Sequence, residues 1–135
     1  MAAVNLDAGE FRYTEYGDPG APPLVLLHGL RSDRSTWAGT APDLAATGYR
    51  VLALDQRGHG ESACTGTYSF EEMREDLRQF TDTLDLARFV LGGHCMGGTV
   101  TELFAERYPG PAGRGARGGQ PASRRRRRLG SRIPA

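Results

Sequence analysis

The sequence predicts an α/β fold in which a mostly parallel β-sheet is flanked by helices. Short apolar runs alternate with amphipathic segments, and each apolar run ends in a turn rich in glycine or charge. Strands buried on both faces have such apolar sequences, and their alternation with helices is typical of β-α-β units with right-handed crossovers. The 135 residues are enough for one domain of modest size.

Charge divides the chain into two parts. All 17 basic residues are Arg, and the 16 acidic residues lie at or before Glu106. Residues 1–109 carry 9 Arg against 16 acidic residues, a net charge of −7, whereas residues 110–135 carry 8 Arg and no acid, a net charge of +8. We therefore expect a folded partial domain over residues 1–109 and a separate tail over residues 110–135.

The first strands precede the central part of the predicted sheet. Residues 3–17 alternate loosely between polar and apolar side chains and predict a hairpin of two short edge strands. Residues 24–27 are wholly apolar, as in a buried strand, and this run ends at His28 and Gly29. Residues 31–35 then form a polar loop.

A helix and a second buried strand are expected next. Pro42 suits the first position of a helix over residues 42–47, and Gly48 suits its C-terminal stop. Residues 49–54 form the strand, and a loop rich in glycine and charge follows over residues 55–62.

The next helix has a clear start signal. Ser69 and Glu72 have the spacing of a capping box, in which each residue satisfies a backbone N–H group of the other. The apolar residues that follow recur at helical spacing and predict one stripe that packs on the sheet. They are Phe70, Met73, Leu77, Phe80 and Leu84.

Residues 89–98, Phe-Val-Leu-Gly-Gly-His-Cys-Met-Gly-Gly, predict a strand, a tight turn and the start of a helix. The Gly-x-Cys-x-Gly pattern at such a turn is that of a nucleophile elbow, with cysteine where serine is usual. The turn would lift Cys95 clear of the sheet. Small residues at Gly93, Gly97 and Gly98 are expected because the strand and helix backbones pass close together there.

Cys95 is the predicted nucleophile. At a helix N-terminus, unpaired N–H groups and the helix dipole favour a negatively charged thiolate. The N–H group of Met96 is one natural oxyanion donor, and that of Leu30 would be the second. Because parallel strands end at one edge of their sheet, we expect residues 28–29 and 55–62 to converge there with Cys95.

The three histidines, His28, His59 and His94, sit in separate turns, so structural hydrogen bonding is favoured over a metal site. The chain has no Lys and no Gly-x-x-x-x-Gly-Lys-[Ser/Thr] motif, so nucleotide binding is not expected. We predict that the protein uses neither a metal nor a cofactor.

The low cysteine content and the lack of a visible signal peptide or membrane span favour an intracellular protein. Two cysteines are too few for a disulfide scaffold, and Cys64, outside any such motif, is expected to be inert. Arg57 and Glu61 could bind substrate, but a turn-stabilising ion pair is favoured. No signal peptide and no membrane span are visible, so a cytoplasmic location is expected. The sequence does not indicate an oligomeric state.

Three motifs together resemble the α/β-hydrolase fold family. They are His28-Gly29 after an apolar strand, Asp55-x-Arg-Gly-His-Gly-x-Ser62, and Gly93-His-Cys-Met-Gly-Gly98. The nearest similarity is to small esterases, lactonases and cofactor-free haloperoxidases, and it covers about residues 10–109, the N-terminal half of such an enzyme.

The resemblance implies roles for residues of all three turns. Cys95 holds the nucleophile position, the N–H groups of Leu30 and Met96 stabilise the oxyanion, and the loop over residues 55–62 shapes the cleft floor. His28, Gly29 and His94 belong to the active-site loops. Dienelactone hydrolases and polyhydroxyalkanoate synthases of this fold use cysteine, so the change from serine permits acyl chemistry. The resemblance implies a small ester, lactone or thioester as substrate, and neither a specific nucleic acid nor a membrane is expected as a partner.

The resemblance also implies a missing half. The family order is nucleophile, acid, then His, but no Asp, Glu or His follows Glu106. We therefore expect a family member truncated after the elbow helix, which has a nucleophile and oxyanion donors but is inactive or very weak.

Residues 110–135 have almost no aliphatic and no aromatic side chains, so a disordered tail is expected. We interpret their Arg, Gly, Pro and Ala runs as a frame-shifted reading of a GC-rich gene. The alternative is a non-catalytic protein with an arginine-rich arm that binds nucleic acid without specificity. A sheet that ends at the elbow strand would expose an edge, which predicts poor solubility or a molten state.

Overall fold

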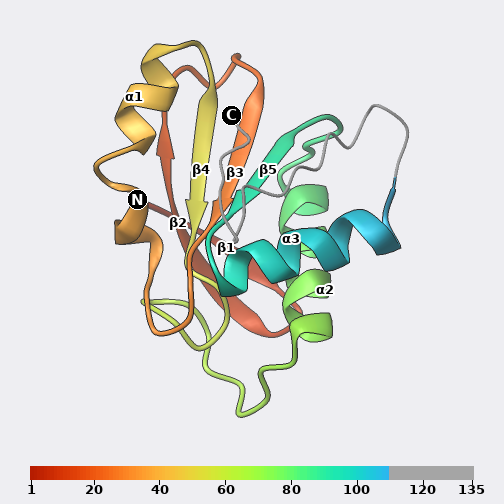
Figure 1. Cartoon of the computed structure of the whole chain (residues 1–135). Helices are drawn as coiled ribbons and strands as arrows, with labels where there is room; N and C mark the ends of the chain where they lie inside the picture. Colours follow the sequence, from red (N-terminus) through yellow and green to blue (C-terminus); the bar gives the residue numbers. More distant parts are fainter. Residues whose placement is uncertain (110–135) are drawn as a thin grey trace.

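A five-stranded sheet with helices on both faces forms the protein in this computed structural model, which describes residues 1–109. Helix α1 covers one face, and α2 and α3 cover the other (Figure 1). The elements in chain order are β1 (Ala2–Leu6), β2 (Gly9–Tyr16), β3 (Pro23–Leu27), the 3-10 turn η1 (Arg34–Trp37), α1 (Ala41–Ala46), β4 (Arg50–Leu54), α2 (Phe70–Thr83), β5 (Val90–Gly93) and α3 (Met96–Arg107). This order confirms the predicted hairpin followed by alternating strands and helices. The predicted tail lies outside the described residues.

The N-terminal hairpin is confirmed, but its place in the sheet differs from the prediction. The strand order is β1-β2-β4-β3-β5, so β2 lies inside the sheet, and the prediction that both strands are edge strands is wrong for β2. Phe11 and Tyr13 explain the difference, because both are buried and Tyr13 packs edge-to-face on Phe80 at a centroid distance of 5.2 Å. Burial of two aromatic side chains stabilises a strand more when the strand lies inside the sheet than when it lies at the edge.

The centre of the sheet is parallel, as predicted. β3 pairs with β4 on one side and with β5 on the other, and Leu27 is opposite both Leu54 and Gly93. All three strands therefore end at the same level. The turns that follow them begin side by side at one edge of the sheet.

Alternate residues of the central strands pack into two separate cores. In β3, Val25 and Leu27 join the core beneath α2 and α3, whereas Leu24 and Leu26 join the core beneath α1. This two-sided burial explains why the strand sequence is an unbroken apolar run.

Helix α2 begins at the predicted capping box. The Glu72 N–H group donates to Ser69 Oγ at 3.1 Å, and the Ser69 N–H group donates to the Glu72 carboxylate at 3.1 Å. Of the predicted stripe, the middle three residues are buried and Leu84 packs against the core. The prediction is wrong for Phe70, which is 42% exposed because it is the first residue of the helix and precedes the part that lies on the sheet.

The segment before β4 is more ordered than its polar sequence indicates. Residues 34–37, partly in the predicted loop, form η1, and the Asp33 carboxylate caps this turn by accepting from the Ser35 N–H group at 2.8 Å. Pro42 is the second residue of α1, one position later than predicted. Gly48 ends the helix as expected, with a φ of +110°.

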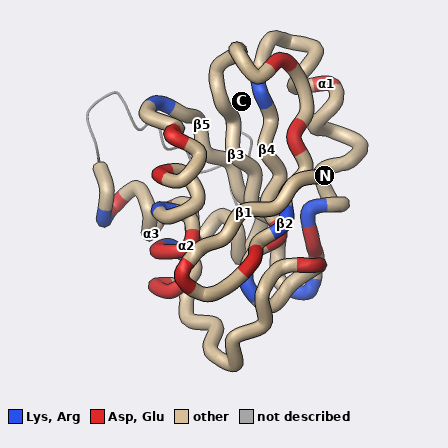
Figure 2. The backbone as a smooth tube through the Cα atoms, turned by 180° about the vertical axis from the view of Figure 1, so that it is seen from behind, with Lys and Arg blue, Asp and Glu red and all other residues tan. Residues whose placement is uncertain are grey.

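Charged residues are frequent along α2, where Figure 2 marks the backbone positions of Asp and Glu in red and of Arg in blue. Arg78 of α2 pairs with Glu75 at 2.9 Å and with Asp82 at 3.1 Å along the solvent-facing side. In the described part of the chain, no helix is both long and apolar enough to cross a membrane.

Candidate active site

Cys95 lies at the turn between β5 and α3 and has the backbone of a strained elbow. Its φ of 54° and ψ of −115° fall in a region that residues other than glycine rarely adopt. The residue caps the N-terminus of α3, and its thiol is free and exposed. The predicted strand, turn and helix around Cys95 are therefore present.

Two glycines allow the strand and helix backbones to approach each other at this turn. A Cβ on Gly93 would lie 2.3 Å from the carbonyl of Gly97, and one on Gly97 would lie 2.2 Å from the carbonyl oxygen of Leu27. A Cβ on Gly98 would meet nothing closer than 3.7 Å, an ordinary contact. The close approach that was predicted is therefore observed at Gly93 and Gly97, whereas a Cβ at Gly98 would make only an ordinary contact with the Gly93 backbone.

Backbone hydrogen bonds fix the turn to its neighbours. The His94 N–H group donates to the Leu27 carbonyl at 3.1 Å, and the His94 carbonyl accepts from the Gly97 N–H group at 3.0 Å. The loop after β3 is equally close, because a Cβ on Gly29 would lie 3.3 Å from Cβ of Cys95. The predicted convergence of residues 28–29 with Cys95 is therefore observed.

The two predicted oxyanion donors occupy suitable segments. Met96 is the first residue of α3, where backbone N–H groups have no acceptor within the helix, and its side chain is buried in the core. Leu30 follows Gly29 in the neighbouring loop and exposes 66% of its surface. Their roles as donors stay predictions.

His28 is held as a neutral structural residue at the edge of the sheet. Its Nε2 accepts from the Gln56 N–H group at 3.0 Å, so Nδ1 carries the proton and donates to the Gly29 carbonyl at 2.8 Å. Burial lowers the pKa of His28 below its ordinary value, which keeps the fully buried ring neutral. Both nitrogens are occupied, so His28 joins the loop after β3 to the loop after β4.

The other two histidines differ in their contacts. His59 stacks near His28 at a centroid distance of 4.9 Å, and its Nδ1 is 2.8 Å from the Arg57 carbonyl oxygen. His94 is exposed, and its Nε2 lies 3.6 Å from Sγ of Cys95, a hydrogen-bonding distance for the large sulfur atom. Within residues 1–109, no group of three or more His, Cys, Asp and Glu side chains is arranged to hold a metal ion.

The loop over residues 55–62 is held by its own polar side chains. The buried Asp55 carboxylate accepts from the Arg34 N–H group at 2.7 Å and from the Glu61 N–H group at 2.9 Å. The Ser62 hydroxyl donates to the Asp55 carbonyl at 2.7 Å and accepts from the Arg12 N–H group at 2.8 Å. These bonds fasten the loop to β2 and to η1, which is a structural role for the first and last residues of the motif.

Arg57 and Glu61 each form an ion pair, as favoured by the sequence, but they pair with other residues and not with each other. The guanidinium of Arg57 makes a bidentate pair with the buried Asp76 of α2, at 2.7 and 2.8 Å. This hydrogen bonding raises the pKa of Arg57 above its ordinary value. Glu61 pairs with Arg34 at 2.7 Å. Arg34 and Asp76 were not predicted as the ion-pair partners. A periodic sequence pattern does not show which charged residue another will contact in the fold.

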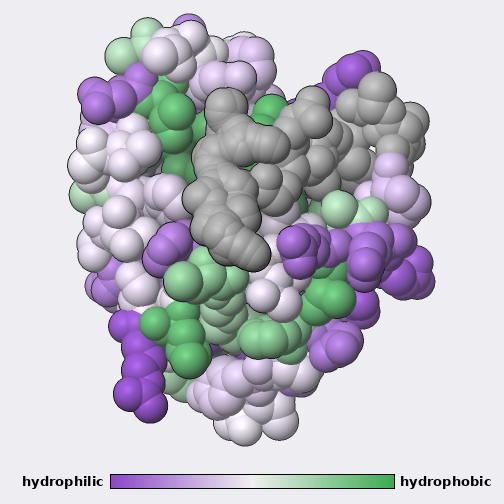
Figure 3. Space-filling view, in the orientation of Figure 1, coloured by the Kyte–Doolittle hydropathy of each residue, from purple (hydrophilic) through white to green (hydrophobic). Residues whose placement is uncertain are grey.

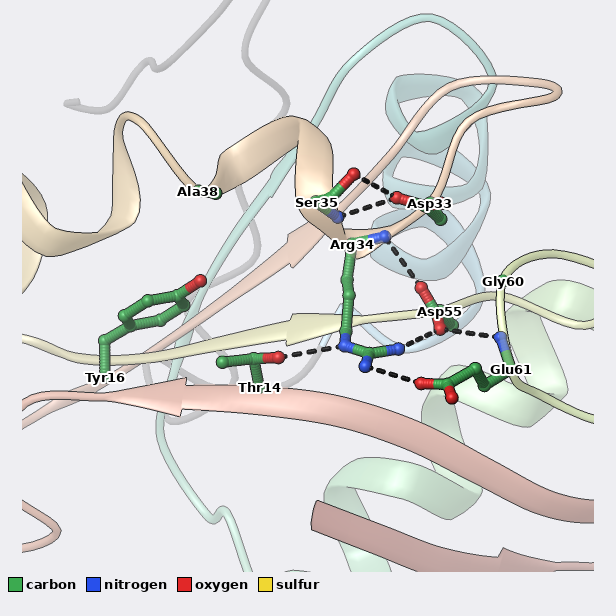
Figure 4. A pocket seen from close by; sticks show the side chains of 9 residues that line it. All are labelled: Thr14, Tyr16, Asp33, Arg34, Ser35, Ala38, Asp55, Gly60 and Glu61. Carbon is green, nitrogen blue, oxygen red and sulfur yellow. Dashed lines mark hydrogen bonds and ion pairs between the residues drawn. The ribbon is translucent and has the colours of Figure 1, made fainter. Parts of the chain in front are cut away.

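A polar pocket of about 380 Å³ lies on the other side of this loop (Figure 4). Figure 4 shows the guanidinium of Arg34 at its centre, held by Asp55, Glu61 and the Thr14 hydroxyl, which it meets at 2.9 Å. The donors and acceptors of these side chains are directed at one another. Cys95 does not line this pocket. The pocket is therefore a structural polar cluster that is separate from the candidate active site.

Part of the surface at the end of the molecule where the parallel strands end is apolar (Figure 1 and Figure 3). Leu30 follows β3, while Tyr68 and Phe70 flank the start of α2, and these three are large apolar residues with exposed side chains. Figure 3 shows hydrophobic surface at the end of the molecule where the parallel strands end in Figure 1. Such surface suits contact with an apolar part of a substrate.

Comparison with known proteins places this geometry in context. A family model described as the alpha/beta hydrolase fold matches residues 22–114. The crystal structure of the enol-lactonase from Burkholderia xenovorans LB400 superposes with a TM-score of 0.75 at 33% sequence identity, covering 80% of this chain and 42% of the lactonase.

Two further proteins are similar in sequence to part of this chain. The dihydrolipoyllysine-residue acetyltransferase component of the acetoin cleaving system of Pseudomonas putida is 44% identical over 91 residues, covering 67% of this chain and 24% of that protein. Epoxide hydrolase A of Mycobacterium tuberculosis is 36% identical over 100 residues, covering 72% of this chain and 31% of the hydrolase. The chain thus spans about a quarter to a third of the length of these relatives.

Proposed function

Because the chain belongs to the alpha/beta-hydrolase fold family, we propose that it carries the nucleophile part of an acyl-transfer site, with Cys95 as the nucleophile. The observation that supports this most is the strained backbone of Cys95 at the N-terminus of α3. Strained backbone of this kind is enriched at active sites, where the surrounding structure holds it in place.

The proposed reaction begins at a small ester, lactone or thioester. The thiolate of Cys95 attacks the carbonyl carbon, and the resulting oxyanion accepts hydrogen bonds from the N–H groups of Met96 and Leu30. Collapse of this intermediate expels the alcohol or thiol and leaves an acyl group on Sγ. Relatives that include an enol-lactonase support this class of substrate.

Release of the acyl group is expected to be slow in this chain. Family members place an acid and a His after the nucleophile, and the 135 residues contain no Asp, Glu or His after Glu106. Acylation of the thiol needs less assistance than attack by water on the thioester, since a thiolate is a strong nucleophile. We therefore propose that the chain becomes acylated and turns over weakly. A cytoplasmic location remains a prediction.

The first prediction concerns acylation by an activated ester. Mixing the chain with para-nitrophenyl acetate should release nitrophenolate in a burst stoichiometric with protein, followed by a slow phase. Cys95→Ala should abolish the burst, whereas Cys64→Ala, which removes the other exposed thiol, should retain it. An equal burst from the wild-type chain and from Cys95→Ala would show that Cys95 is not the nucleophile.

A further inference from the structure

The imidazole of His94 is next to the proposed nucleophile in both sequence and space. Its Nε2 lies 3.6 Å from Sγ of Cys95, and both side chains are exposed. Adjacent side chains in a strand point to opposite faces, so this contact depends on the turn. The φ of 54° at Cys95 departs from strand geometry and allows the two side chains to meet on the same side.

Backbone hydrogen bonds fix the main chain of His94 on two sides. Its N–H group donates to the Leu27 carbonyl at the end of β3, and its carbonyl accepts from the Gly97 N–H group in the first turn of α3. Gly29 lies close to the ring, since a Cβ there would be 3.3 Å from Nδ1 of His94. The imidazole is therefore carried by a fixed main chain and is exposed beside the thiol.

In the described part of the chain, Sγ of Cys95 contacts the ring of His94, and the other two histidines bond elsewhere. Both ring nitrogens of His28 are bonded to backbone groups, and the Nδ1 atom of His59 faces the Arg57 carbonyl. Among the described residues, the ring of His94 has its hydrogen bond to Cys95 and no other. Within residues 1–109 its Nδ1 atom has no hydrogen-bond partner, and the exposed ring can exchange a proton with water there while Nε2 faces the thiol.

We propose that His94 is the general base for Cys95, which forms a thiol–imidazole pair from two neighbours in one turn. This proposal rests on the function proposed above. It supplies from within the elbow a base that family members take from a residue later in the chain. An imidazole in contact with a thiol is the usual means of forming a nucleophilic thiolate at neutral pH.

Nε2 of His94 takes the thiol proton, and the thiolate forms a bond from Sγ to the carbonyl carbon while the carbonyl electrons move to the oxygen. When the carbonyl re-forms, the bond to the leaving oxygen breaks, and this oxygen takes the proton from Nε2. The ring is then neutral again, and the acyl group stays on Sγ.

Alkylation by iodoacetamide tests the pair without requiring acyl transfer. Peptide mass spectrometry separates modification of Cys95 from that of Cys64, an exposed thiol in the same chain that serves as the internal reference. At neutral pH, His94→Gln and His94→Ala should lower the Cys95 rate relative to Cys64 by about tenfold or more, because an unassisted thiol is mostly protonated. At strongly alkaline pH the ratio should approach that of the wild-type chain, since every thiol is then ionised.

Added imidazole provides a second measurement, which a purely structural role would not affect. Free imidazole should restore part of the ester acylation of His94→Ala and have little effect on His94→Gln, which leaves less space. An unchanged ratio of Cys95 to Cys64 alkylation in both variants, or an equal loss at neutral and alkaline pH, would overturn the proposal. If the wild-type chain is not acylated at all, the proposed function fails; if it is acylated equally with and without His94, the role of His94 alone fails.

Discussion

At the scale of single residues, the geometry around Cys95 depends on neighbours that carry no reactive group. His28 illustrates this, because its ring bonds to Gln56 and Gly29 and thereby fixes two of the three turns that meet at the edge of the sheet. Arg57 has a similar role farther from Cys95, since its pair with Asp76 fastens the loop over residues 55–62 to α2. These motif residues build the site by holding its loops.

The Arg57–Asp76 pair gives a prediction of stability. The Arg57 side chain is 8% exposed and that of Asp76 is 6% exposed, so removing one partner leaves a buried, unpaired charge. Arg57→Met should lower the free energy of unfolding by about 3–5 kcal/mol, and the double variant Arg57→Met with Asp76→Leu should recover much of this loss. Urea unfolding measures both. A loss below about 1 kcal/mol in the single variant would contradict the structural role.

At the scale of elements, the crossing of β5 and α3 decides where the nucleophile lies. Gly93 and Gly97 bring the two backbones together, and Gly97 also touches the end of β3. The helix can therefore begin directly above the sheet, with its first N–H groups beside the thiol. A larger residue at this crossing would push the helix away and change the direction of Cys95.

A matched pair of substitutions in α3 tests this crossing. Gly97→Ala should destabilise the protein by about 1–3 kcal/mol or more, because its Cβ would lie 2.2 Å from a backbone oxygen. Gly98→Ala has ordinary contacts only and should be neutral or stabilise the helix by up to about 1 kcal/mol. Thermal unfolding of the two variants compares them, and equal losses of stability would refute the close approach at Gly97.

The elements that the sequence predicted well are those with strong local signals. Apolar runs predicted β3 and β4, and the capping box predicted the first residue of α2 within one position. The errors concern features set by tertiary contacts, such as the inner position of β2 and the exposure of Phe70. The contact of His94 with Cys95 depends on one backbone torsion angle, which no residue pattern specifies.

At the scale of the whole molecule, polar bridges join elements that are distant in the sequence. The Tyr108 hydroxyl at the end of α3 donates to the Glu75 carboxylate of α2 at 2.6 Å, and Arg74 and Arg78 also bond to this carboxylate. Burial opposes ionisation of Glu75, but these three hydrogen-bonding partners outweigh it and hold the pKa of Glu75 at about 2, below its ordinary value of 4.5. The carboxylate thus stabilises the packing of the two helices while it is ionised.

The acid stability of the protein follows from this shift. A carboxyl whose pKa is lowered by folding contributes its full stability above its unfolded value of 4.5 and loses it as the pH falls toward about 2. Glu75→Gln should therefore destabilise the protein at neutral pH and make unfolding less dependent on pH across this window. Glu102→Gln, on the exposed side of α3, is the control. Unfolding curves of equal pH dependence for wild type and Glu75→Gln would exclude this contribution.

The position of the acyl group on the protein decides whether Cys95 is the nucleophile. The wild-type chain, treated briefly with para-nitrophenyl acetate and digested under conditions that preserve thioesters, can be mapped by peptide mass spectrometry. We predict an acetyl group on the peptide that contains Cys95, and little on the peptide that contains Cys64, the other exposed thiol. Equal acetylation of the two cysteines, or acetylation of Cys64 alone, would contradict the assignment of Cys95 as the nucleophile.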